Sequence, residues 1–313
     1  MSKPIEDKLD KIPVVRHLAS FLKSLKLPGL EGLTFYDLLE LYITGIFKGT
    51  LTERASAISF SFFSAIFPFI LFIIILIPYI PVEGFRIEFE QFLQSFLPPQ
   101  TSDFFFKNIF NNIGVNQQGG LISTVFILSI FLMANGVNAI FVGFESSYHR
   151  QLTRSVVRQY LLSLGVGLLL GFLLIFTVAI YGYFEIFIIK PFFEELSGVS
   201  YADTNASLFW VVFGKYLFFV MMVYLAIAIL YYFGTKEGKE SRFFSVGALF
   251  STLLIMISSF LFGLYIENFS SYNELYGSIG ALLILLFYLW LNSNIVLLGF
   301  ELNMSLIRLR KSF

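Results

Sequence analysis

Cysteine is absent from this chain of 313 residues, and histidine occurs only twice, at His17 and His149. Without cysteine there can be no disulfides, no thiolate metal site and no cysteine nucleophile. The two histidines form no His-x-His pattern or similar cluster, which metal-dependent hydrolysis would need. The composition therefore argues against a metal-dependent nuclease, and we expect neither a metal ion nor a cofactor.

Charge is also scarce, since 13% of the residues are charged while 57% are hydrophobic. A soluble domain carries about 25% charged residues. The formal net charge is zero, so the chain has no global attraction to nucleic acid, and we predict no nucleic-acid partner. Aromatic residues are abundant instead, with 41 Phe and 16 Tyr.

Six apolar runs are each long enough to cross a bilayer as a helix, which takes about 20 residues. They lie near residues 57–80, 121–144, 160–189, 208–233, 243–266 and 278–300. We therefore predict an all-α polytopic membrane protein with six transmembrane helices in one domain, 51–313, preceded by a cytoplasmic arm, 1–50. No signal-peptide core precedes the first run, which we expect to be an uncleaved anchor.

The positions of Lys and Arg predict the orientation in the membrane. All but four of the 21 Lys and Arg residues fall in segments on the same side as the two termini. The four exceptions are Arg86, Lys107, Lys190 and Lys215. Because cytoplasmic segments carry the positive excess, we predict that both termini are cytoplasmic. Lys215, near the outer end of the fourth run, is expected to snorkel or to pair with Glu185 or another outer-side acid.

Amphipathic segments are predicted on both faces of the membrane. Two helices, near 85–97 and 102–113, should lie on the outer face, where they either cover the bundle or insert partly into the outer leaflet. On the cytoplasmic face, Thr34-Phe35-Tyr36-Asp37 resembles a capping box with Asp as its acidic member, and predicts an elbow helix.

Small residues recur every four positions in two of the runs, which allows another helix to approach closely. These ridges are Ala57, Ser61 and Ala65 in the first run, and Ser163, Gly167 and Gly171 in the third. We expect both ridges to be helix-packing surfaces.

The second and sixth runs share the pattern Asn-x4-Gly-Phe-Glu, from Asn138 to Glu145 and from Asn294 to Glu301. Residues seven apart lie on the same helix face, about two turns apart. Such polar groups must face protein or a wet cavity, because exposure to lipid would cost several kcal/mol each. We hypothesise an internal pseudo-repeat in which the two helices bracket one cavity that opens to the cytoplasm.

The candidate substrate-binding or cavity-lining residues are Arg54, Asn135, Asn138, Glu145, Asn292, Asn294, Glu301 and Asn303. Arg54 would be the counter-charge to the two carboxylates at the inner mouth of the cavity. Two alternatives stay open, a buried Glu–Arg–Asn network that only fixes helix register and an accidental match. Arg150, Arg154 and Arg158 share one helix face and are candidates for binding anionic headgroups at the membrane edge.

Taken together, these residues resemble the YihY/BrkB family of bacterial inner-membrane proteins over roughly residues 35–308. The matching features are Arg54-Ala55 through Phe60 to Phe67-Pro68, Gly247-Ala248, Tyr265, Tyr276-Gly277, Trp290-Leu291 and Leu298-Gly299-Phe300-Glu301-Leu302-Asn303. The chain departs from the family at Tyr231-Tyr232-Phe233-Gly234, where a Tyr is usually followed closely by a Pro. The resemblance implies six transmembrane helices in the inner membrane and an envelope role, with some members linked to serum resistance or export of lipid A precursors.

No catalytic motif accompanies this resemblance, although the family has also carried a ribonuclease label. Gly-x-Ser-x-Gly, His-Glu-x-x-His and an ATP-binding loop are all missing from the sequence, so we predict no enzyme and assign no catalytic residue. Polar groups without a nucleophile suit a transporter or flippase-like protein that moves an amphiphile, such as an anionic lipid or lipid precursor. The alternatives are an ion- or proton-coupled small-solute transporter and an envelope scaffold without transport activity. Membrane lipids are the predicted partners, while a second copy of the chain and envelope proteins stay open.

Overall fold

The computed structural model describes residues 21–26, 34–37, 39–40, 43, 50–76, 87, 119–146, 155–184, 201–234, 243–268 and 278–311. Six long helices account for most of this part of the chain. They are α4 (Leu51–Leu76), α8 (Gly119–Glu145), α9 (Val156–Phe184), α11 (Tyr201–Gly234), α12 (Val246–Asn268) and α14 (Ser278–Lys311). Within the same residues, the pairing of Lys26 with Thr34 is an isolated β-bridge outside any strand.

Each of the six predicted spans overlaps one of these helices, and the prediction of an all-helical membrane protein is confirmed for the described residues. Five stretches among them are long and apolar enough to cross a membrane. They are Phe126–Glu145, Val156–Phe184, Phe213–Gly234, Val246–Tyr265 and Leu282–Ile307. The count of six spans and the cytoplasmic side of the termini stay predictions.

Two of the helices are longer than a bilayer is thick. With 34 residues each, α11 and α14 measure about 51 Å, against roughly 30 Å for the hydrocarbon core. In α14 the apolar stretch Leu282–Ile307 continues past Glu301, and the helix ends only at Lys311. The sequence placed the end of this span at residue 300, and the helix continues because no Gly or Pro interrupts the last turns.

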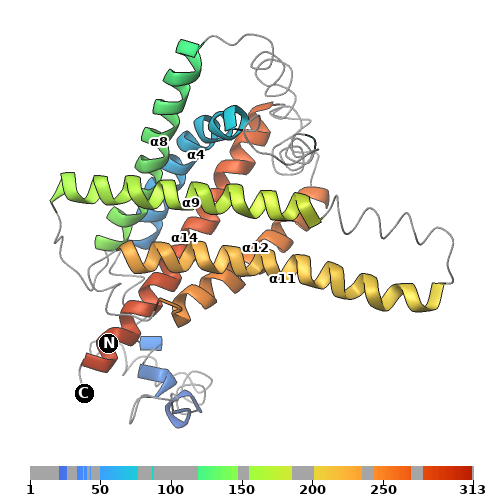
Figure 1. Ribbon diagram of the computed structural model, residues 1–313. Helices are drawn as coiled ribbons and strands as arrows, with labels where there is room; N and C mark the ends of the chain where they lie inside the picture. The colour runs from blue at the N-terminus through green and yellow to red at the C-terminus, as the bar shows by residue number, and fades with distance from the viewer. Residues whose placement is uncertain are drawn as a thin grey trace.

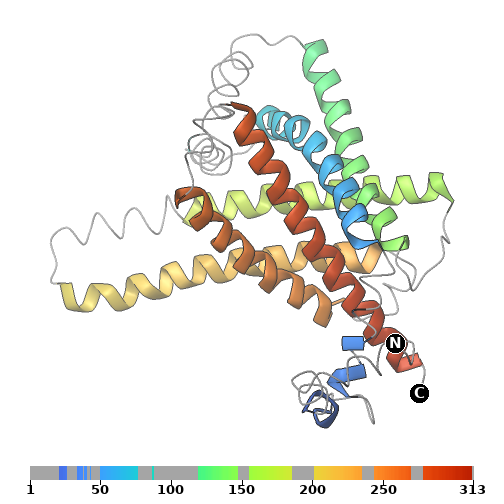
Figure 2. The same ribbon diagram turned by 180° about the vertical axis from the view of Figure 1, so that it is seen from behind.

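The helices form two sets, α9 with α11 and α4 with α8, α12 and α14. Figures 1 and 2 show them from opposite sides. Helix α4 packs against α8 and α14, and α12 packs against α14. Helices α9 and α11 run alongside each other across one face of the molecule, and α9 also packs on α8 (Figure 1).

Five helices meet at one end of the bundle, which we call the helix-end junction. It comprises the first turns of α4 and α12, the last turns of α8 and α11, and α14 from Ile295 to Ser305. The buried apolar core is richest here and includes Ile58, Phe141, Phe144, Leu297 and Phe300. The distribution of Lys and Arg predicts that these same ends are cytoplasmic.

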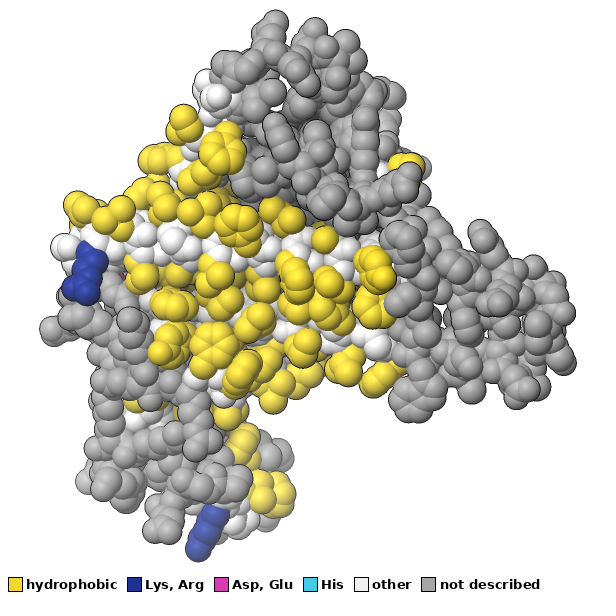
Figure 3. All heavy atoms as spheres, viewed as in Figure 1, with side chains coloured by type: hydrophobic (Ala, Val, Ile, Leu, Met, Phe, Trp, Pro, Cys, Tyr) yellow, Lys and Arg dark blue, Asp and Glu magenta, His cyan; other side chains and the backbone are white. Residues whose placement is uncertain are grey.

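The outward faces of α9 and α11 are apolar. Figure 3 shows a largely hydrophobic surface over both helices. The exposed side chains of α9 and α11 include Phe172, Phe176, Tyr216 and Leu217. An apolar surface of this extent would be a liability in water but suits contact with acyl chains.

The capping box predicted before the elbow helix is confirmed. The backbone N–H of Thr34 donates to Asp37 Oδ2 over 2.9 Å, and the N–H of Asp37 donates back to Thr34 Oγ1 over 3.3 Å. Each of these N–H groups lacks an intrahelical acceptor, so the two side chains satisfy both. The outer amphipathic helices near 85–97 and 102–113 lie outside the described residues, apart from Ile87.

Of the two small-residue ridges, the one in α9 is confirmed as a packing surface. Ser163, Gly167 and Gly171 are buried, and a Cβ on Gly167 would lie 3.5 Å from the Met133 side chain of α8. In α4 the prediction is wrong for Ala57, which is exposed, whereas Ala65 is buried against α8 near Gly136. At this end of α4 the neighbouring helix α8 packs on Ile58 instead, where a Cβ on Gly143 would lie 2.9 Å from the Ile58 side chain.

Candidate functional site

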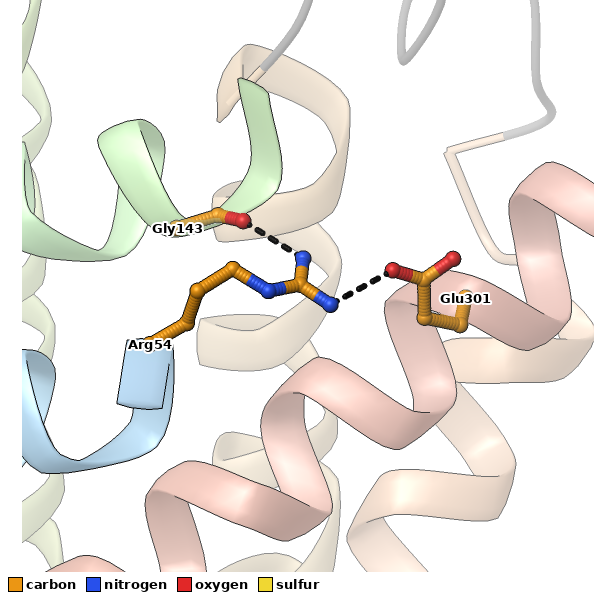
Figure 4. Close-up of polar contacts among 3 residues, drawn as sticks. All are labelled: Arg54, Gly143 and Glu301. Atoms are coloured by element: carbon orange, nitrogen blue, oxygen red, sulfur yellow. Dashed lines mark hydrogen bonds and ion pairs between the residues drawn. The ribbon is translucent and has the colours of Figure 1, made fainter. Parts of the chain in front are cut away.

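A buried ion pair joins three helices at the helix-end junction (Figure 4). Arg54, in the first turn of α4, donates from Nη2 to Glu301 Oε1 of α14 over 2.9 Å, and from Nη1 to the carbonyl oxygen of Gly143 in α8 over 2.8 Å. The side chains of Arg54 and Glu301 are both buried. The Gly143 carbonyl is within the last turn of α8, where carbonyls have no intrahelical donor, so it is free to accept from a side chain.

The two copies of the Asn-x4-Gly-Phe-Glu pattern meet at this point. Phe144 and Phe300 occupy the same position in the two copies, and their rings stack with centroids 4.1 Å apart and planes 11° apart. Tyr231 of α11 packs edge-on against both rings, at 5.6 Å and 5.9 Å. Arg54 bridges the Gly of one copy and the Glu of the other, and Glu145, the second motif carboxylate, is buried at the end of α8.

The asparagines of the two copies have different partners. Asn138 Oδ1 lies 3.5 Å from Ser163 Oγ of α9, whereas Asn294 Nδ2 donates to the Trp290 carbonyl of its own helix over 2.8 Å. Asn292 likewise donates to its own helix, at Tyr288, and Asn135 is half-buried on α8. The structure therefore brings together the Gly-Phe-Glu ends of the motifs, and a cavity lined by the asparagines stays a prediction.

Asn303 fastens the start of α12 to α14. Its Nδ2 donates to Ser245 Oγ over 2.7 Å, and its Oδ1 accepts from the backbone N–H of Gly247 over 2.8 Å. Ser245 is the N-cap of α12, because its Oγ also accepts from the N–H of Ala248. Asn303 thus accepts from an N–H in the first turn of α12 that has no acceptor within the helix. Its role is therefore structural.

Replacing Asn303 with alanine should loosen the first turn of α12 and lower the free energy of unfolding by about 1–3 kcal/mol, because the buried Gly247 N–H loses its acceptor and the buried Ser245 Oγ loses a donor. Amide hydrogen exchange of residues 246–250 should accelerate relative to the rest of α12. The control is Leu253→Ala, a change at an exposed position of the same helix. Unchanged exchange at residues 246–250 in the Asn303 variant would contradict this role.

Helices α11, α12 and α14 are tied together by two buried hydroxyls that the sequence analysis missed. Tyr231 Oη donates to the Val296 carbonyl over 2.6 Å and lies 2.6 Å from Ser251 Oγ, which donates to the Ile295 carbonyl over 3.1 Å. Each hydroxyl has one proton to donate, so the two hydroxyls share two protons among these three contacts. A signal was available, because Gly247 and Ser251 form a small residue pair at the four-residue spacing used for the other ridges.

The variant Tyr231→Phe should lower the free energy of unfolding by about 1–2 kcal/mol, because the ring packing is kept while the Val296 carbonyl and Ser251 lose a buried hydrogen-bond partner. Thermal unfolding in detergent measures the change. Tyr216→Phe, at an exposed position on the same helix, removes a hydroxyl outside the junction and should melt like the wild type. Equal melting temperatures for the two variants would show that the Tyr231 hydroxyl adds nothing.

The three arginines proposed for headgroup binding are only partly visible. Arg158 is exposed in the first turn of α9, while Arg150 and Arg154 lie outside the described residues. Within the described ranges, no group of three or more His, Asp or Glu side chains is placed to hold a metal ion.

Comparison with known proteins gives the family. The family described as virulence factor BrkB matches residues 43–312. The chain is similar to the ribonuclease-like protein YfkH of Bacillus subtilis, with 26% identity over 83% of this chain and 91% of that protein. It is also similar to UPF0761 membrane proteins of Aggregatibacter aphrophilus, with 25% identity over 84% of this chain and 89% of that protein, and of Coxiella burnetii, with 23% identity over 79% and 84%. No solved structure matches the chain. Because the family match covers most of its length, the chain belongs to the virulence factor BrkB family of membrane proteins.

Proposed function

We propose that this membrane protein is a transporter that moves an amphiphile, an anionic lipid or lipid precursor, across the bacterial inner membrane. The observation that carries the proposal is the Arg54–Glu301 ion pair, buried between α4 and α14 among apolar helices. Charged groups in such surroundings are expensive, and in membrane proteins they commonly mark the path of a substrate. A packed apolar pair at the same place would hold the two helices at lower cost.

In this proposal the ion pair closes the cytoplasmic side of the transporter. Arg54 links α4 to both α8 and α14, so these helix ends separate only when its hydrogen bonds are exchanged for others. A phosphate or carboxylate headgroup can make that exchange, because a guanidinium binds either group through paired N–H donors. Glu145, buried at the matching motif position on α8, offers Arg54 a second carboxylate during the opening.

The outer surface of the bundle is consistent with a lipid as the substrate. The apolar face of α9 and α11 (Figure 3) would keep the acyl chains in contact with protein while the headgroup passes the polar residues. The half-buried asparagines of α8 and α14, Asn135, Asn138, Asn292 and Asn294, are the proposed polar lining for that headgroup.

Two other functions remain candidates because of specific features. The two buried carboxylates, Glu145 and Glu301, could couple a small solute to protons or another cation, in which case transport would depend on an ion gradient and ignore the lipid headgroup. A scaffold for envelope proteins would need only the packing of the helix-end junction, and in purified membranes it would move no substrate.

The proposal is tested by identifying the lipids that co-purify with the protein in a mild detergent. The double variant Arg54→Met/Glu301→Leu replaces the ion pair by apolar side chains of similar length and should keep the fold. We expect the wild type to retain a specific anionic lipid, and the double variant to retain about tenfold less of it. The control Thr52→Met/Glu53→Leu makes the same kind of change at exposed neighbouring positions and should retain the lipid. The same bulk lipid in all three preparations would contradict the proposal.

A further inference from the structure

Two short segments of the N-terminal arm, residues 21–26 and 34–37, pack on each other, and we call this pair the arm element. The Phe35 N–H donates to the Leu25 carbonyl over 2.8 Å, next to the isolated β-bridge. The arm element lies beyond the helix-end junction, on the side where α14 ends (Figures 1 and 2). The distribution of Lys and Arg predicts that this side is cytoplasmic.

Three apolar side chains of the arm element are exposed. The exposed fractions of Phe21, Leu25 and Phe35 are 60%, 43% and 41%. Leu25 and Phe35 lie opposite each other in the backbone pairing, and residues paired in this way direct their side chains to the same face. Apolar side chains that stay exposed together in so small an element are typical of a surface that contacts something else.

The arm element is also basic, because both of its lysines, Lys23 and Lys26, are exposed. Lys23 Nζ lies 4.5 Å from the ring centroid of Tyr36, and such a contact positions an ammonium without neutralising it. The carboxylate of Asp37, by contrast, accepts from the backbone N–H and the hydroxyl of Thr34. The element therefore presents positive charge and apolar side chains together.

The sequence around the first of the two segments has the same character. Residues 11–30 include four Lys or Arg and neither Asp nor Glu. Apolar residues recur at Val14, Leu18, Phe21 and Leu25, which is the spacing of one helix face. A basic amphipathic segment of this kind is typical of proteins that bind an anionic membrane surface.

We propose that the arm element docks on the anionic phospholipids of the cytoplasmic leaflet. The three apolar side chains would enter the boundary between headgroups and acyl chains, and the two lysines would lie among the phosphates. Only residues 38–50 separate the arm element from α4, so the chain between them extends at most about 50 Å. This tether keeps the membrane surface within reach, and weak docking is therefore sufficient. The docking goes beyond the proposed function and requires no transport.

The proposal is tested with a fluorophore on the arm element of the full chain. Because the chain contains no cysteine, Ser24→Cys provides a single labelling site at an exposed position of the element. The labelled protein is placed in vesicles of phosphatidylcholine with or without phosphatidylglycerol, which have the same composition in both leaflets. An environment-sensitive label should be at least twofold brighter with phosphatidylglycerol, because docking moves it out of water. Salt at 1 M should remove the difference, because it shortens the Debye length to about 3 Å.

Variants of the labelled protein separate charge from apolar contact. Lys23→Gln/Lys26→Gln should lower the equilibrium constant for docking about 25-fold, because each lysine near an anionic surface contributes about fivefold. This constant is read from the fluorescence at increasing phosphatidylglycerol content. Lys23→Arg/Lys26→Arg keeps both charges and should keep docking, whereas Phe21→Ser should weaken it. Glu53→Gln removes an exposed charge from α4 instead and should not weaken docking.

Three results would overturn lipid docking by the arm element. Unchanged fluorescence in Lys23→Gln/Lys26→Gln would show that the lysines do not hold it on the lipid. A label that is equally bright with and without phosphatidylglycerol would show an element that packs on the helix bundle. A label that is equally dim in both would indicate a surface for a partner protein. Because the fluorescence reports contact alone, each of these results would leave the proposed transport function standing.

Discussion

Gly299→Val is expected to lower the free energy of unfolding by about 3 kcal/mol, since forced overpacking in a close-packed core costs this much. A Cβ on Gly299 would overlap Ser251 Oγ and would lie 2.6 Å from both the Gly247 carbonyl oxygen and Tyr231 Oη. In the same way, a Cβ on Gly247 would overlap the Gly299 carbonyl. The backbones of α12 and α14 are therefore in direct contact at this crossing, and neither can move without breaking the hydrogen bonds of Tyr231 or Asn303.

The effect of Gly299→Val is measured as the loss of melting temperature and of monodisperse protein in detergent. Gly263→Val on α12 is the matched control, because no described atom lies within 4 Å of a Cβ at that position. The same β-branched residue enters a helix in both variants, so the difference between them isolates the crossing. A Gly299→Val protein as stable as Gly263→Val would show that α12 and α14 do not touch as described.

Arg54→Met is expected to destabilise the protein by about 3–5 kcal/mol, because it leaves the Glu301 carboxylate buried without its counter-charge, and Glu301→Leu should do the same by leaving Arg54 unpaired. The double variant Arg54→Met/Glu301→Leu should recover most of that loss, because a packed apolar pair replaces a buried ion pair at little cost. Thermal unfolding of the two single variants and the double variant gives a double-mutant cycle. We expect the double variant to be more stable than either single variant.

One result of this double-mutant cycle would contradict the ion pair between Arg54 and Glu301. If the losses of the single variants simply add in the double variant, Arg54 and Glu301 do not interact, and the ion pair in Figure 4 does not exist in the membrane. The control Thr52→Met/Glu53→Leu changes two exposed residues of the same helical turn and should shift stability by less than about 0.5 kcal/mol.

Much of the architecture is predictable from the sequence because it depends on local rules. Runs of about 20 apolar residues can only be satisfied as helices in lipid, and all six runs fall on helices. The capping box at Thr34 and the Ser163–Gly171 ridge depend on spacing within one segment, and both are present. Helix ends were less predictable, as in α14, which continues to Lys311.

Contacts between helices were harder to predict, because spacing defines a face but not its partner. The match between the second and sixth runs correctly singled out residues that meet, since Phe144 stacks on Phe300 and Arg54 bridges the two copies. The same match could not reveal that Asn138 faces Ser163 while Asn294 bonds to its own helix. Those partners depend on how each helix is rotated and on its crossing angle, which follow from the packing of all the helices.

The contacts of Tyr231 are a second example of partners that sequence spacing cannot predict. This residue lies in the last turn of α11, which continues as a helix to Gly234 without a proline. Its hydroxyl reaches Ser251 and Val296, which lie 20 and 65 positions away along the chain. Spacing along α11 therefore could not reveal the partners of this residue, which makes some of the main contacts of the junction.

The most direct test of the proposed function is a lipid-flip measurement in vesicles that contain the purified protein and a fluorescent phosphatidylglycerol. A membrane-impermeant reductant bleaches the label in the outer leaflet only, so protected fluorescence reports the lipid that has not crossed. Wild type and the Thr52→Met/Glu53→Leu control should reduce the protected fraction beyond half, and a labelled phosphatidylcholine should not cross. The folded Arg54→Met/Glu301→Leu variant should move phosphatidylglycerol at least tenfold more slowly. Transport at the wild-type rate by that variant, or no transport by any of them with or without an ion gradient, would contradict a lipid path controlled by the Arg54–Glu301 pair.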